Sequence, residues 1–553
     1  MRRVTARSFL MRCALLGAFV VVWNAPAAAQ QRAFDVLDYN LTLDLPDAGK
    51  TIEGVAVLSV RRVLRADTLV LDLLDLRVRT VRVGAASVAF VQADGHVRIP
   101  LHGAVGDTLL VTVAYSGVPL DGLIIGTDSA GRWMAFGDNW PNRARHWIPS
   151  VDHPSDKATV TWTVRAPSAL RVVANGQLLE ETPLPQPRDP DGSSGRTMAR
   201  TLTRWREAQP IATYLMVIAA APLARYDLGP TACGLAEIGG CVPQSVYVAP
   251  EQRAILPGEF ARAGDIVTYF GRLVGPFGYE KLAHLQSSTR FGGMENASAI
   301  FYADAIFRRS GADVGLIAHE TAHQWFGDLV TEREWAHVWL SEGFATYFAA
   351  LYRGHALGDS ARIGDMRRTR AEIVAAPEVL ARPVIDTAQT DLLALLNTNS
   401  YQKGGWVLHM LRGLVGDSAF FGGIRDYVAT HRHSTALTDD LRLAVERRAG
   451  VPLAWFFDQW LRRPGFAELT ASWRYDAAAH RVVLEVRQGE RFGAFRAPLT
   501  VTVTDAAGIV HRVTVQLPAD RSTQFVLDVP LSAPPKALVL DPDVSLLATI
   551  RLP

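Results

Sequence analysis

HETAHQWFG at residues 319–327 and WLSEGFA at residues 339–345 decide the fold of this chain. Each lies in a run with apolar residues at three- and four-residue spacing, which predicts two helices. The first helix holds two histidines four residues apart, His319 and His323, which lie one turn above each other and point the same way. Two neutral imidazoles in this arrangement can bind one zinc ion.

A carboxylate follows the first histidine directly, and another lies in the second helix. Glu320 lies about 100° around the helix from His319, where it can reach a zinc-bound water without being a ligand. Glu342 follows His323 after eighteen residues, a connection long enough for the second helix to fold back beside the first. Two histidines and this glutamate would leave one position open for water, as catalytic zinc requires.

The same residues allow less specific interpretations. The histidine pair could face solvent on an ordinary helix, and Glu342 could be a helix N-terminal carboxylate favoured by the macrodipole. His337 is a competing ligand candidate, but it has no helical partner four residues away. We therefore interpret His337 as a core or surface histidine.

Residues 291–297, FGGMENA, combine paired glycines with a carboxylate. Glycines of this kind fit a strand edge where another backbone approaches closely. A turn with a surface glutamate is the alternative interpretation of Glu295. The residue pattern alone does not separate the two.

The pattern of the remaining chain predicts an α+β protein of several domains. Alternating apolar residues predict an N-terminal antiparallel β domain over residues 30–225, in which the proline-rich stretch Pro183–Arg196 forms a hairpin loop. Helical spacing predicts a mainly helical domain over residues 226–465, with helices in residues 266–273, 313–329, 338–352 and 404–414. Alternation then returns, which predicts a small C-terminal β-sandwich over residues 466–553.

The first 29 residues have the pattern of an export signal. Arginines lead into an apolar run from Cys13 to Trp23, and small residues follow up to Ala29, where we expect cleavage. An uncleaved N-terminal anchor is the alternative, although the run is short for a membrane span. We therefore predict an exported protein, periplasmic or extracellular, with no stable membrane insertion after cleavage of residues 1–29.

The charge balance excludes one class of partner. The chain has 57 basic and 55 acidic residues, and its net charge is +2. Nucleic-acid binding requires a concentrated basic face, and the sequence shows no block of like charges. We therefore expect no nucleic-acid partner.

Two cysteines lie outside the export signal, Cys233 and Cys241, with seven residues between them. In an exported protein, two cysteines this close predict a local disulfide. Two buried thiols are the alternative. A structural zinc site is not expected, because it would need more ligands than this pair supplies.

Five motifs occur in an order that resembles the membrane-alanyl-aminopeptidase family of zinc peptidases, which includes leukotriene hydrolase. The resemblance covers the chain from about residue 34 to residue 467. The motifs are Ala-Arg…Asp-x-Pro…Lys within residues 143–157, Gly-Gly-Met-Glu-Asn at 292–296, His-Glu-x-x-His-Gln-Trp-Phe-Gly at 319–327, Trp-Leu-x-Glu-Gly-Phe at 339–344 and Tyr-Gln-Lys-Gly at 401–404.

The resemblance implies a thermolysin-like catalytic domain and a role for each motif residue. His319, His323 and Glu342 would bind zinc, one ion per chain. Glu320 would be the general base and then the proton donor to the leaving amine, and Tyr401 would donate to the oxyanion. The implied substrate-binding residues are Gly292, Gly293, Met294, Glu295 and Asn296, of which Glu295 would hold the substrate's α-ammonium group.

These roles imply a zinc-dependent aminopeptidase that removes residues from the free N-termini of peptides. Three alternatives stay open at this point: a zinc endopeptidase of thermolysin type, a hydrolase acting on a lipid epoxide, and a non-catalytic zinc-binding protein. An assay with blocked substrates separates the first of these from an aminopeptidase.

The sequence departs from the family pattern at several positions. The family has a Gln or Glu that helps to bind the amine where an ungapped comparison gives Trp140, with Asp138 and Asn139 nearby. Ser341 replaces a frequent Asn, and Ala349 replaces a frequent acidic residue of the second helix. We therefore expect differences around the zinc ligands and leave the second amine-binding group unassigned.

Overall fold

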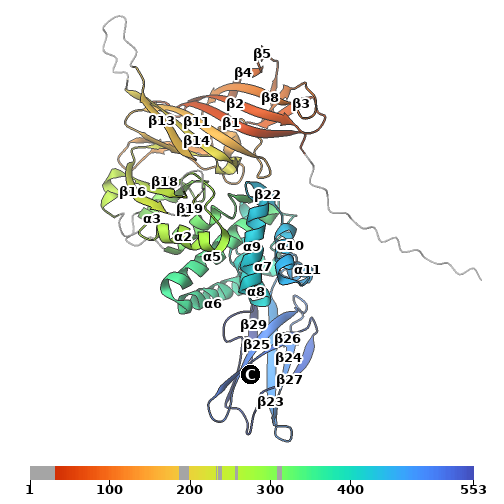
Figure 1. Cartoon of the computed structure of the whole chain (residues 1–553). Helices are drawn as coiled ribbons and strands as arrows, with labels where there is room; N and C mark the ends of the chain where they lie inside the picture. Colours follow the sequence, from red (N-terminus) through yellow and green to blue (C-terminus); the bar gives the residue numbers. More distant parts are fainter. Residues whose placement is uncertain are drawn as a thin grey trace, which may run out of the picture.

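The computed structural model describes residues 32–185, 198–231, 233–234, 240–255, 260–307 and 314–552. Three regions follow one another along the molecule: a β-sheet region, a mainly helical region and a second, smaller β region (Figure 1). The α+β fold class is therefore confirmed. The predicted export signal, residues 1–29, lies outside the described residues.

The N-terminal region is built on a sheet that has eight strands within the described residues. In sheet order they are β13 (Gln177–Pro183), β14 (Arg200–Ala212), β11 (Lys157–Pro167), β1 (Phe34–Asp44), β2 (Ile52–Arg62), β8 (Thr108–Gly117), β4 (Arg77–Val83) and β5 (Ala86–Ser87). Neighbouring strands are antiparallel except β1 and β11, which pair in parallel. The predicted antiparallel sheet is thus correct for all but this central pair.

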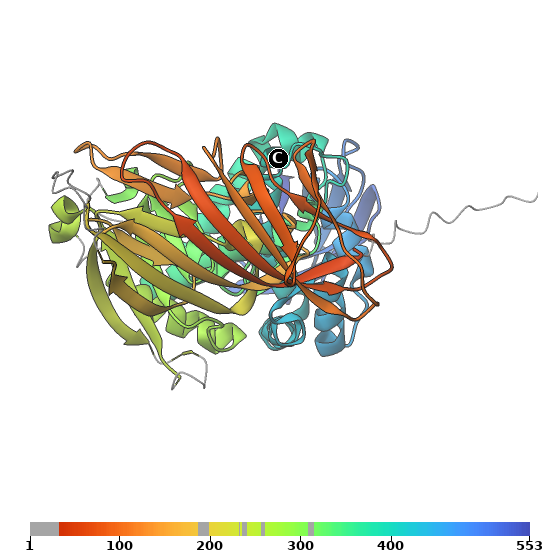
Figure 2. The same cartoon turned by 90° about the horizontal axis from the view of Figure 1, so that it is seen from above.

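Seen from above, this sheet extends across the top of the central region (Figure 2). Its strands alternate because one face is covered: in β1, Tyr39, Leu41 and Leu43 are fully buried, whereas their neighbours are partly exposed. β13 and β14 pair as antiparallel neighbours, as the proline-rich hairpin loop requires. Residues 186–197 of that loop lie outside the described residues.

Two smaller groups of strands complete the N-terminal region among the described residues. The four-stranded sheet has the order β12 (Arg171–Ala174), β15 (Ile218–Ala221), β10 (Trp133–Gly137) and β9 (Leu123–Thr127). The three-stranded sheet has the order β3 (Thr68–Asp72), β7 (His96–Pro100) and β6 (Val91–Ala93). β10 matters for the site because it ends two residues before Asn139-Trp140, at the boundary with the helical region.

The central region begins with strands, where helical spacing was predicted from residue 226. A sheet that has five strands in the described part of the chain has the order β16 (Ala224–Thr231), β17 (Val242–Val248), β18 (Leu282–Ser287), β20 (Ala299–Ala303) and β19 (Gly293–Met294). Every residue of β18 is buried, since β17, β18 and β20 pair in parallel and such strands are covered on both faces. A strand covered on both faces shows no alternation, so the periodicity did not reveal it.

Helices form the rest of the central region. They are α2 (Ala263–Val274), α3 (Asp304–Phe307), α4 (Val314–His323), α5 (Trp339–Leu357), α6 (Asp359–Ala375), α7 (Pro377–Ala381), α8 (Gly404–Val415), α9 (Asp417–His431), α10 (Thr438–Ala449) and α11 (Ala454–Leu461). A short parallel pair, β21 (Val330–Glu332) and β22 (Ser434–Ala436), lies among them.

The helix predicted to run to Leu329 ends at His323 instead. The chain turns directly after it, and Gly327 has a φ of 113°, a left-handed conformation that favours glycine. The connection that follows contains β21 and brings α5 back beside α4. The predicted return of the second helix is therefore correct, although the first helix is shorter than expected.

The C-terminal region contains two small sheets among the described residues, as the predicted sandwich requires. One has the order β27 (Ser522–Leu527), β24 (Arg481–Gln488), β23 (Ala467–Asp476) and β29 (Ala548–Arg551). The other has the order β26 (Val510–Leu517), β25 (Ala497–Thr504) and β28 (Ala537–Leu540). The fully buried side chains of Leu484, Leu499 and Val501 belong to its core.

The predicted disulfide between Cys233 and Cys241 is wrong, because the structure has no bond between these two described residues. The thiol of Cys233 donates instead to the carbonyl of Val267, at 3.4 Å. Its sulfur also lies against Gly271, one turn further along α2. The side chain is therefore turned into the helix rather than toward Cys241.

None of the described helices combines the length and the apolarity needed to cross a bilayer.

Candidate active site

α4 and α5 bring three metal-binding side chains together. Nε2 of His319 and Nε2 of His323 are 3.1 Å apart, and Oε2 of Glu342 lies 3.3 Å from each of them. A tetrahedral zinc ion with ligand distances of about 2.0–2.1 Å would separate its ligand atoms by about 3.4 Å. The three atoms therefore already form one face of a zinc tetrahedron, and the donor set of two imidazoles and one carboxylate fits zinc.

The electrostatics of the site also favour a cation. Glu295, Glu320 and Glu342 are all buried around His323. Burial alone would lower the pKa of His323, but the three carboxylates outweigh it and raise that pKa well above its usual value. Among the described residues no lysine or arginine side chain forms an ion pair with any of these glutamates, so a divalent ion would balance their charge.

Glu342 remains ionised in this arrangement. Its burial opposes ionisation, but the charge of His323 and hydrogen bonds from both histidines hold its pKa at about 2. Its buried Oε2 lies 3.3 Å from Nε2 of each histidine. An anionic oxygen that faces two imidazole nitrogens is the donor that a metal ion requires.

Two groups behind the site orient His323. Its Nδ1 lies 3.1 Å from the carbonyl oxygen of Phe326 and 3.0 Å from the hydroxyl of Ser341. A proton on Nδ1 leaves Nε2 free to bind metal. Ser341, which replaces the family's frequent Asn, therefore still contacts a predicted metal ligand.

Tyr401 reaches the site from the segment before α8. It lies in a π-helical turn, Asn399–Lys403, and its hydroxyl donates to Oε1 of Glu342 at 2.8 Å. The close approach of Gly343 to Gly404 makes this possible, because a Cβ on Gly343 would lie 2.8 Å from the carbonyl carbon of Gly404. Burial, followed by the charge of Glu342, raises the pKa of Tyr401 well above its usual value, so the hydroxyl stays protonated.

The glycine-rich segment forms an edge of the site, which is one of the two interpretations that its residues left open. β19 is the edge strand of the five-stranded sheet within the described residues. A Cβ on Gly293 would lie 2.1 Å from Oε1 of Glu320, so only glycine lets this edge approach the carboxylate. Burial raises the pKa of Glu320 well above its usual value. A raised pKa makes this carboxylate a better proton acceptor.

Glu295 follows the edge strand and faces the same space. Its carboxylate lies within 4.8 Å of ligand atoms of both Glu320 and His323. Gln324 positions its backbone, since Nε2 of Gln324 donates to the carbonyl oxygen of Glu295 at 2.8 Å. The Gln that follows the second histidine thus links α4 to the edge segment.

Asn296 is the predicted substrate-binding residue that lies elsewhere. Its side chain is completely buried and is not part of the cleft lining. His337, the competing ligand candidate, also lies outside the site, with its Nδ1 2.8 Å from the hydroxyl of Thr438.

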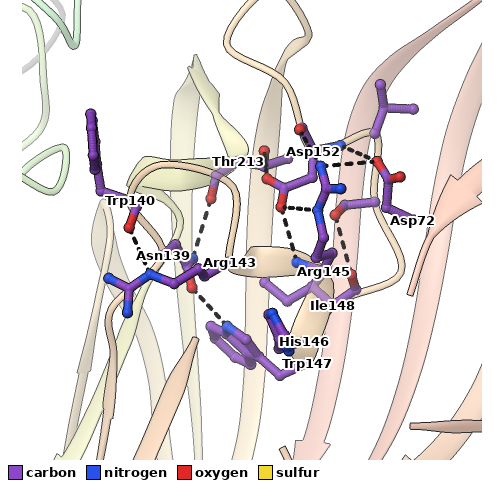
Figure 3. A network of polar contacts seen from close by, with 12 residues as sticks. Asp72, Asn139, Trp140, Arg143, Arg145, His146, Trp147, Ile148, Asp152 and Thr213 are labelled. Carbon is purple, nitrogen blue, oxygen red and sulfur yellow. Dashed lines mark hydrogen bonds and ion pairs between the residues drawn. The ribbon is translucent and has the colours of Figure 1, made fainter. Parts of the chain in front are cut away.

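Trp140 also lines the cleft, beside the glycine-rich segment. Its ring contacts Phe291 at a centroid distance of 6.2 Å and Trp335 at 5.4 Å. In Figure 3 the indole stands apart from the polar network, while its backbone carbonyl accepts a hydrogen bond from Nε of Arg143 at 2.7 Å. The position at which the family has an amine-binding amide or acid is thus aromatic in this chain.

Neither polar neighbour of Trp140 supplies the second amine-binding group. Asp138 is completely buried and forms ion pairs with Arg143 at 3.2 Å and Arg290 at 3.3 Å. Asn139 donates to the carbonyl of Met216. It also accepts from the indole N–H of Trp147 at 2.8 Å (Figure 3). Both side chains are occupied by structural contacts.

The segment behind Trp140 is held by a second set of contacts. Asp152 accepts from Nε of Arg145 at 3.1 Å and from the hydroxyl of Thr213 at 2.8 Å (Figure 3). Its backbone N–H donates to Asp72 at 3.0 Å. The motif Ala-Arg…Asp-x-Pro therefore holds the loop after β10 against the N-terminal sheets.

A cleft of about 490 Å³ joins these groups. Its lining includes all the predicted zinc ligands, Glu320, Tyr401, and the segment from Gly292 to Glu295. It also contains residues that sequence reasoning did not identify: Gly315, Leu316, Thr346, Ala350, Arg353, Asp365, Arg368, Thr369, Leu396 and Gln402. The spacing of Glu342, Thr346, Ala350 and Arg353 on one helix face could have indicated part of this lining.

Comparison with known families gives two matches. Residues 36–215 match the description "Peptidase M1 N-terminal domain", and residues 266–460 match "Peptidase family M1 domain". Among solved structures, the chain resembles the crystal structure of an M1 zinc metallopeptidase from Deinococcus radiodurans. The TM-score is 0.67 at 27% identity, over 79% of this chain and 95% of that one.

Several curated proteins are similar in sequence. Bovine (Bos taurus) glutamyl aminopeptidase is 26% identical over 64% of this chain and 36% of its own length. Leucyl aminopeptidase of Saccharolobus solfataricus is 24% identical over 79% of this chain and 55% of its own length. Leukotriene A-4 hydrolase of Xenopus laevis is 24% identical over 74% of this chain and 68% of its own length. The chain thus spans only about a third to a half of the two aminopeptidases.

Proposed function

This chain belongs to peptidase family M1, and from that premise we propose that it is a zinc-dependent aminopeptidase. It would release single residues from the free N-termini of peptides. One zinc ion per chain would be bound by His319, His323 and Glu342. The similar proteins named as glutamyl and leucyl aminopeptidases support the same reaction class.

One observation supports this function above the alternatives. The three ligand atoms, the Glu320 carboxylate and the Glu295 carboxylate share one cleft, and the last lies within 4.8 Å of ligand atoms of Glu320 and His323. A thermolysin-type endopeptidase needs the first four groups but has no use for a buried anion this close to the reacting bond. An aminopeptidase needs it to bind the substrate's ammonium group.

When bound, zinc would supply Lewis acidity toward the scissile carbonyl and lower the pKa of water to about 7. Glu320 would accept a proton from the attacking water and deliver it to the nitrogen of the departing peptide. Its raised pKa suits the first step, because a more basic carboxylate accepts a proton more readily. Gly293 leaves the space in which this carboxylate moves.

Tyr401 would stabilise the charge that develops on the carbonyl oxygen. Its hydroxyl is protonated and is held at the site by its hydrogen bond to Glu342. Loss of a donor of this kind commonly lowers the rate by about 10²–10³. The Gly343–Gly404 contact keeps the hydroxyl in reach of the reacting bond.

Glu295 would pair with the α-ammonium group of the first residue. Gly292, Gly293 and Met294 would receive the substrate backbone along the edge strand, and Trp140 would border the first side chain. Since Asp138 and Asn139 are occupied, Glu295 would bind the ammonium group without a second group from that loop. An acylated N-terminus has no charge to pair with Glu295 and adds bulk next to it.

The decisive experiment compares matched peptides with free and acetylated N-termini, with zinc and with a chelator. We expect cleavage of the free peptide only, release of its first residue, and loss of activity with the chelator. A Glu295→Gln variant should lose most of its activity on the free peptide because the charge that binds the ammonium group is absent.

Other outcomes would assign the alternatives. Equal cleavage of both peptides at internal bonds would identify an endopeptidase. Zinc bound in the site without cleavage of any peptide would identify a non-catalytic zinc-binding protein. Metal analysis giving two ions per chain would contradict the single-site assignment.

We further propose that the chain is exported, with cleavage after Ala29, and that its domains span residues 30–225, 226–465 and 466–553. The basic, apolar and small-residue order of residues 1–29 supports export. N-terminal sequencing of the mature protein should begin at Gln30. Retention of Met1 in a membrane fraction would contradict cleavage.

A further inference from the structure

The cleft continues beyond the predicted zinc ligands along one face of α5. Glu342, Thr346, Ala350 and Arg353 line it at three- and four-residue spacing. Arg353 lies eleven positions after Glu342, so the helix rises about 16 Å between them. The cleft is therefore longer than a single substrate residue requires.

The middle of this stretch of α5 leaves room in the cleft for a substrate. Its side chains are short, namely Thr346, Ala349 and Ala350. Ala349 stands where the family has a frequent acidic residue. Between Glu342 and Arg353, the described residues of α5 that line the cleft thus include no carboxylate that would repel an anionic substrate group.

Two arginines lie at the far end of this stretch. Asp365 of α6 accepts from Nε of Arg353 at 2.7 Å and from Nη2 of Arg368 at 2.8 Å. Asp365 itself is buried, while the side chain of Arg368 is 62% exposed and lines the cleft. Among the described residues, Glu372 is the other acid that pairs with Arg368, at 3.9 Å. Asp365 thus holds the guanidinium groups together and leaves Arg368 accessible.

The direction in which a bound peptide extends follows from the positions of β19 and α6. β19, which Glu295 directly follows, lies toward the N-terminal sheet, whereas α6 lies on the side of α5 away from that sheet (Figure 1). With the ammonium group at Glu295 and the first carbonyl at the predicted zinc ligands, the later residues extend toward α6.

We propose that Arg368, with Arg353 beside it, binds the C-terminal carboxylate of short peptide substrates. This inference rests on the proposed aminopeptidase function. An extended peptide advances about 3.3 Å per residue, so 16 Å accommodates about five residues. The length of an arginine side chain shortens this to peptides of about three to five residues. A guanidinium group matches a carboxylate with paired N–H donors.

The test compares peptides of three to six residues that carry a free C-terminal carboxylate with the same peptides as amides. An aminoacyl chromogenic substrate, which has no carboxylate, reports the basal activity. We expect the acids to have a kcat/KM about two- to fivefold above the amides, the size of one partly exposed charge contact. The ratio should decrease as salt is raised and should be lost in peptides of about ten residues.

Arg368→Gln should remove this ratio and leave the chromogenic rate unchanged, and Arg368→Lys should restore part of it. Arg367→Gln is the matched control, because Arg367 is exposed on the same helix but does not line the cleft. A wild-type enzyme that cleaves acids and amides equally, or a ratio that persists in Arg368→Gln, would overturn this inference alone. Absence of cleavage of the chromogenic substrate would overturn the proposed function as well.

Discussion

The two sides of the cleft are held in place by contacts of different range. On the donor side, defined as His319, Glu320, His323 and Glu342, two neighbouring helices place every group. On the Trp140 side, the aromatic ring depends on Arg143, which pairs with Asp121 and Asp138 and holds the carbonyl of Trp140.

This difference separates the residues that carry out bond cleavage from those that select the substrate. The donor side is set by helical period and one short connection, so its geometry varies little and suits bond cleavage. The Trp140 side rests on contacts between distant segments, so a substitution there can change the shape of the site while the donor atoms stay in place. Variants on the donor side should therefore change kcat, and variants on the Trp140 side should change the preference for the first residue of the substrate.

The largest effect is expected from Glu320→Gln on the donor side. Removal of the proton acceptor should lower kcat on an aminoacyl chromogenic substrate by about 10³, within the range of general acid–base catalysis. Zinc content should stay at the wild-type level, because Glu320 is not among the three predicted ligands. A variant that retains a tenth of the wild-type kcat would show that another group accepts the proton.

The next largest effect tests how closely the edge strand approaches the donor side. A Cβ in Gly293→Ala would lie 2.1 Å from Glu320, and a displacement of about 1 Å can lower a rate by about 10². Gly292→Ala is the matched control, because its added Cβ has no atom within 4 Å. Steady-state kinetics of the pair should show a large loss in the first and little change in the second. Equal losses would contradict the contact with Glu320.

A smaller effect is expected for Ser341→Ala. The hydroxyl is one of two groups at Nδ1 of His323, and the Phe326 carbonyl remains in the variant. Zinc affinity should fall by about tenfold, the lower end for a group that orients a ligand. Competition with a chelator measures it, and kcat at saturating zinc should change much less. Unchanged affinity would show that the carbonyl alone orients the imidazole.

On the Trp140 side, Trp140→Ala should alter the preference for the first residue of the substrate rather than kcat. Loss of the ring widens the site, so the ratio of kcat/KM for bulky first residues to that for alanine should rise by about three- to tenfold. The kcat for alanyl substrates should stay within about twofold, since the donor side is unchanged. A uniform loss over all first residues would place Trp140 in support of the fold instead.

The smallest effect concerns Glu332, which lies in the connection between α4 and α5. Its side chain is buried, neither carboxylate oxygen has a hydrogen-bond partner, and burial raises its pKa to about 8. The folded protein keeps a proton that the unfolded chain loses above its usual pKa of about 4.3. Wild-type stability should therefore fall as pH rises from about 4.3 to 8.

Glu332→Gln does not titrate and should escape this loss. Its melting temperature should approach that of the wild type at pH 5 and exceed it by a few °C at pH 8.5. A difference that is the same at both pH values would show that Glu332 does not keep a proton in the folded protein.

Much of the fold was predictable wherever one face of an element is buried. Alternation predicted β1 and β11, and helical spacing predicted α2, α5 and α8. β18 was missed because strands covered on both faces carry no period. The end of α4 was missed because the turn after His323 depends on Gly327 and on packing against α5.

The site shows the same division between features that local sequence patterns predicted and features that they did not. Local spacing placed His319, His323 and Glu320, and the resemblance added Glu295 and Tyr401. Neither could predict that Asp138 pairs with two arginines, or that Cys233 turns toward α2. Those outcomes depend on Arg290 and Val267, which are distant in sequence.

The sequence by itself determined that two imidazoles and a carboxylate would meet, because a helical turn and an eighteen-residue connection leave few other arrangements. Only the tertiary structure decided that the ring of Trp140 lines the same cleft and that two arginines lie at its far end. Those positions are set by packing between segments far apart in the chain, and no local pattern encodes which segments will meet.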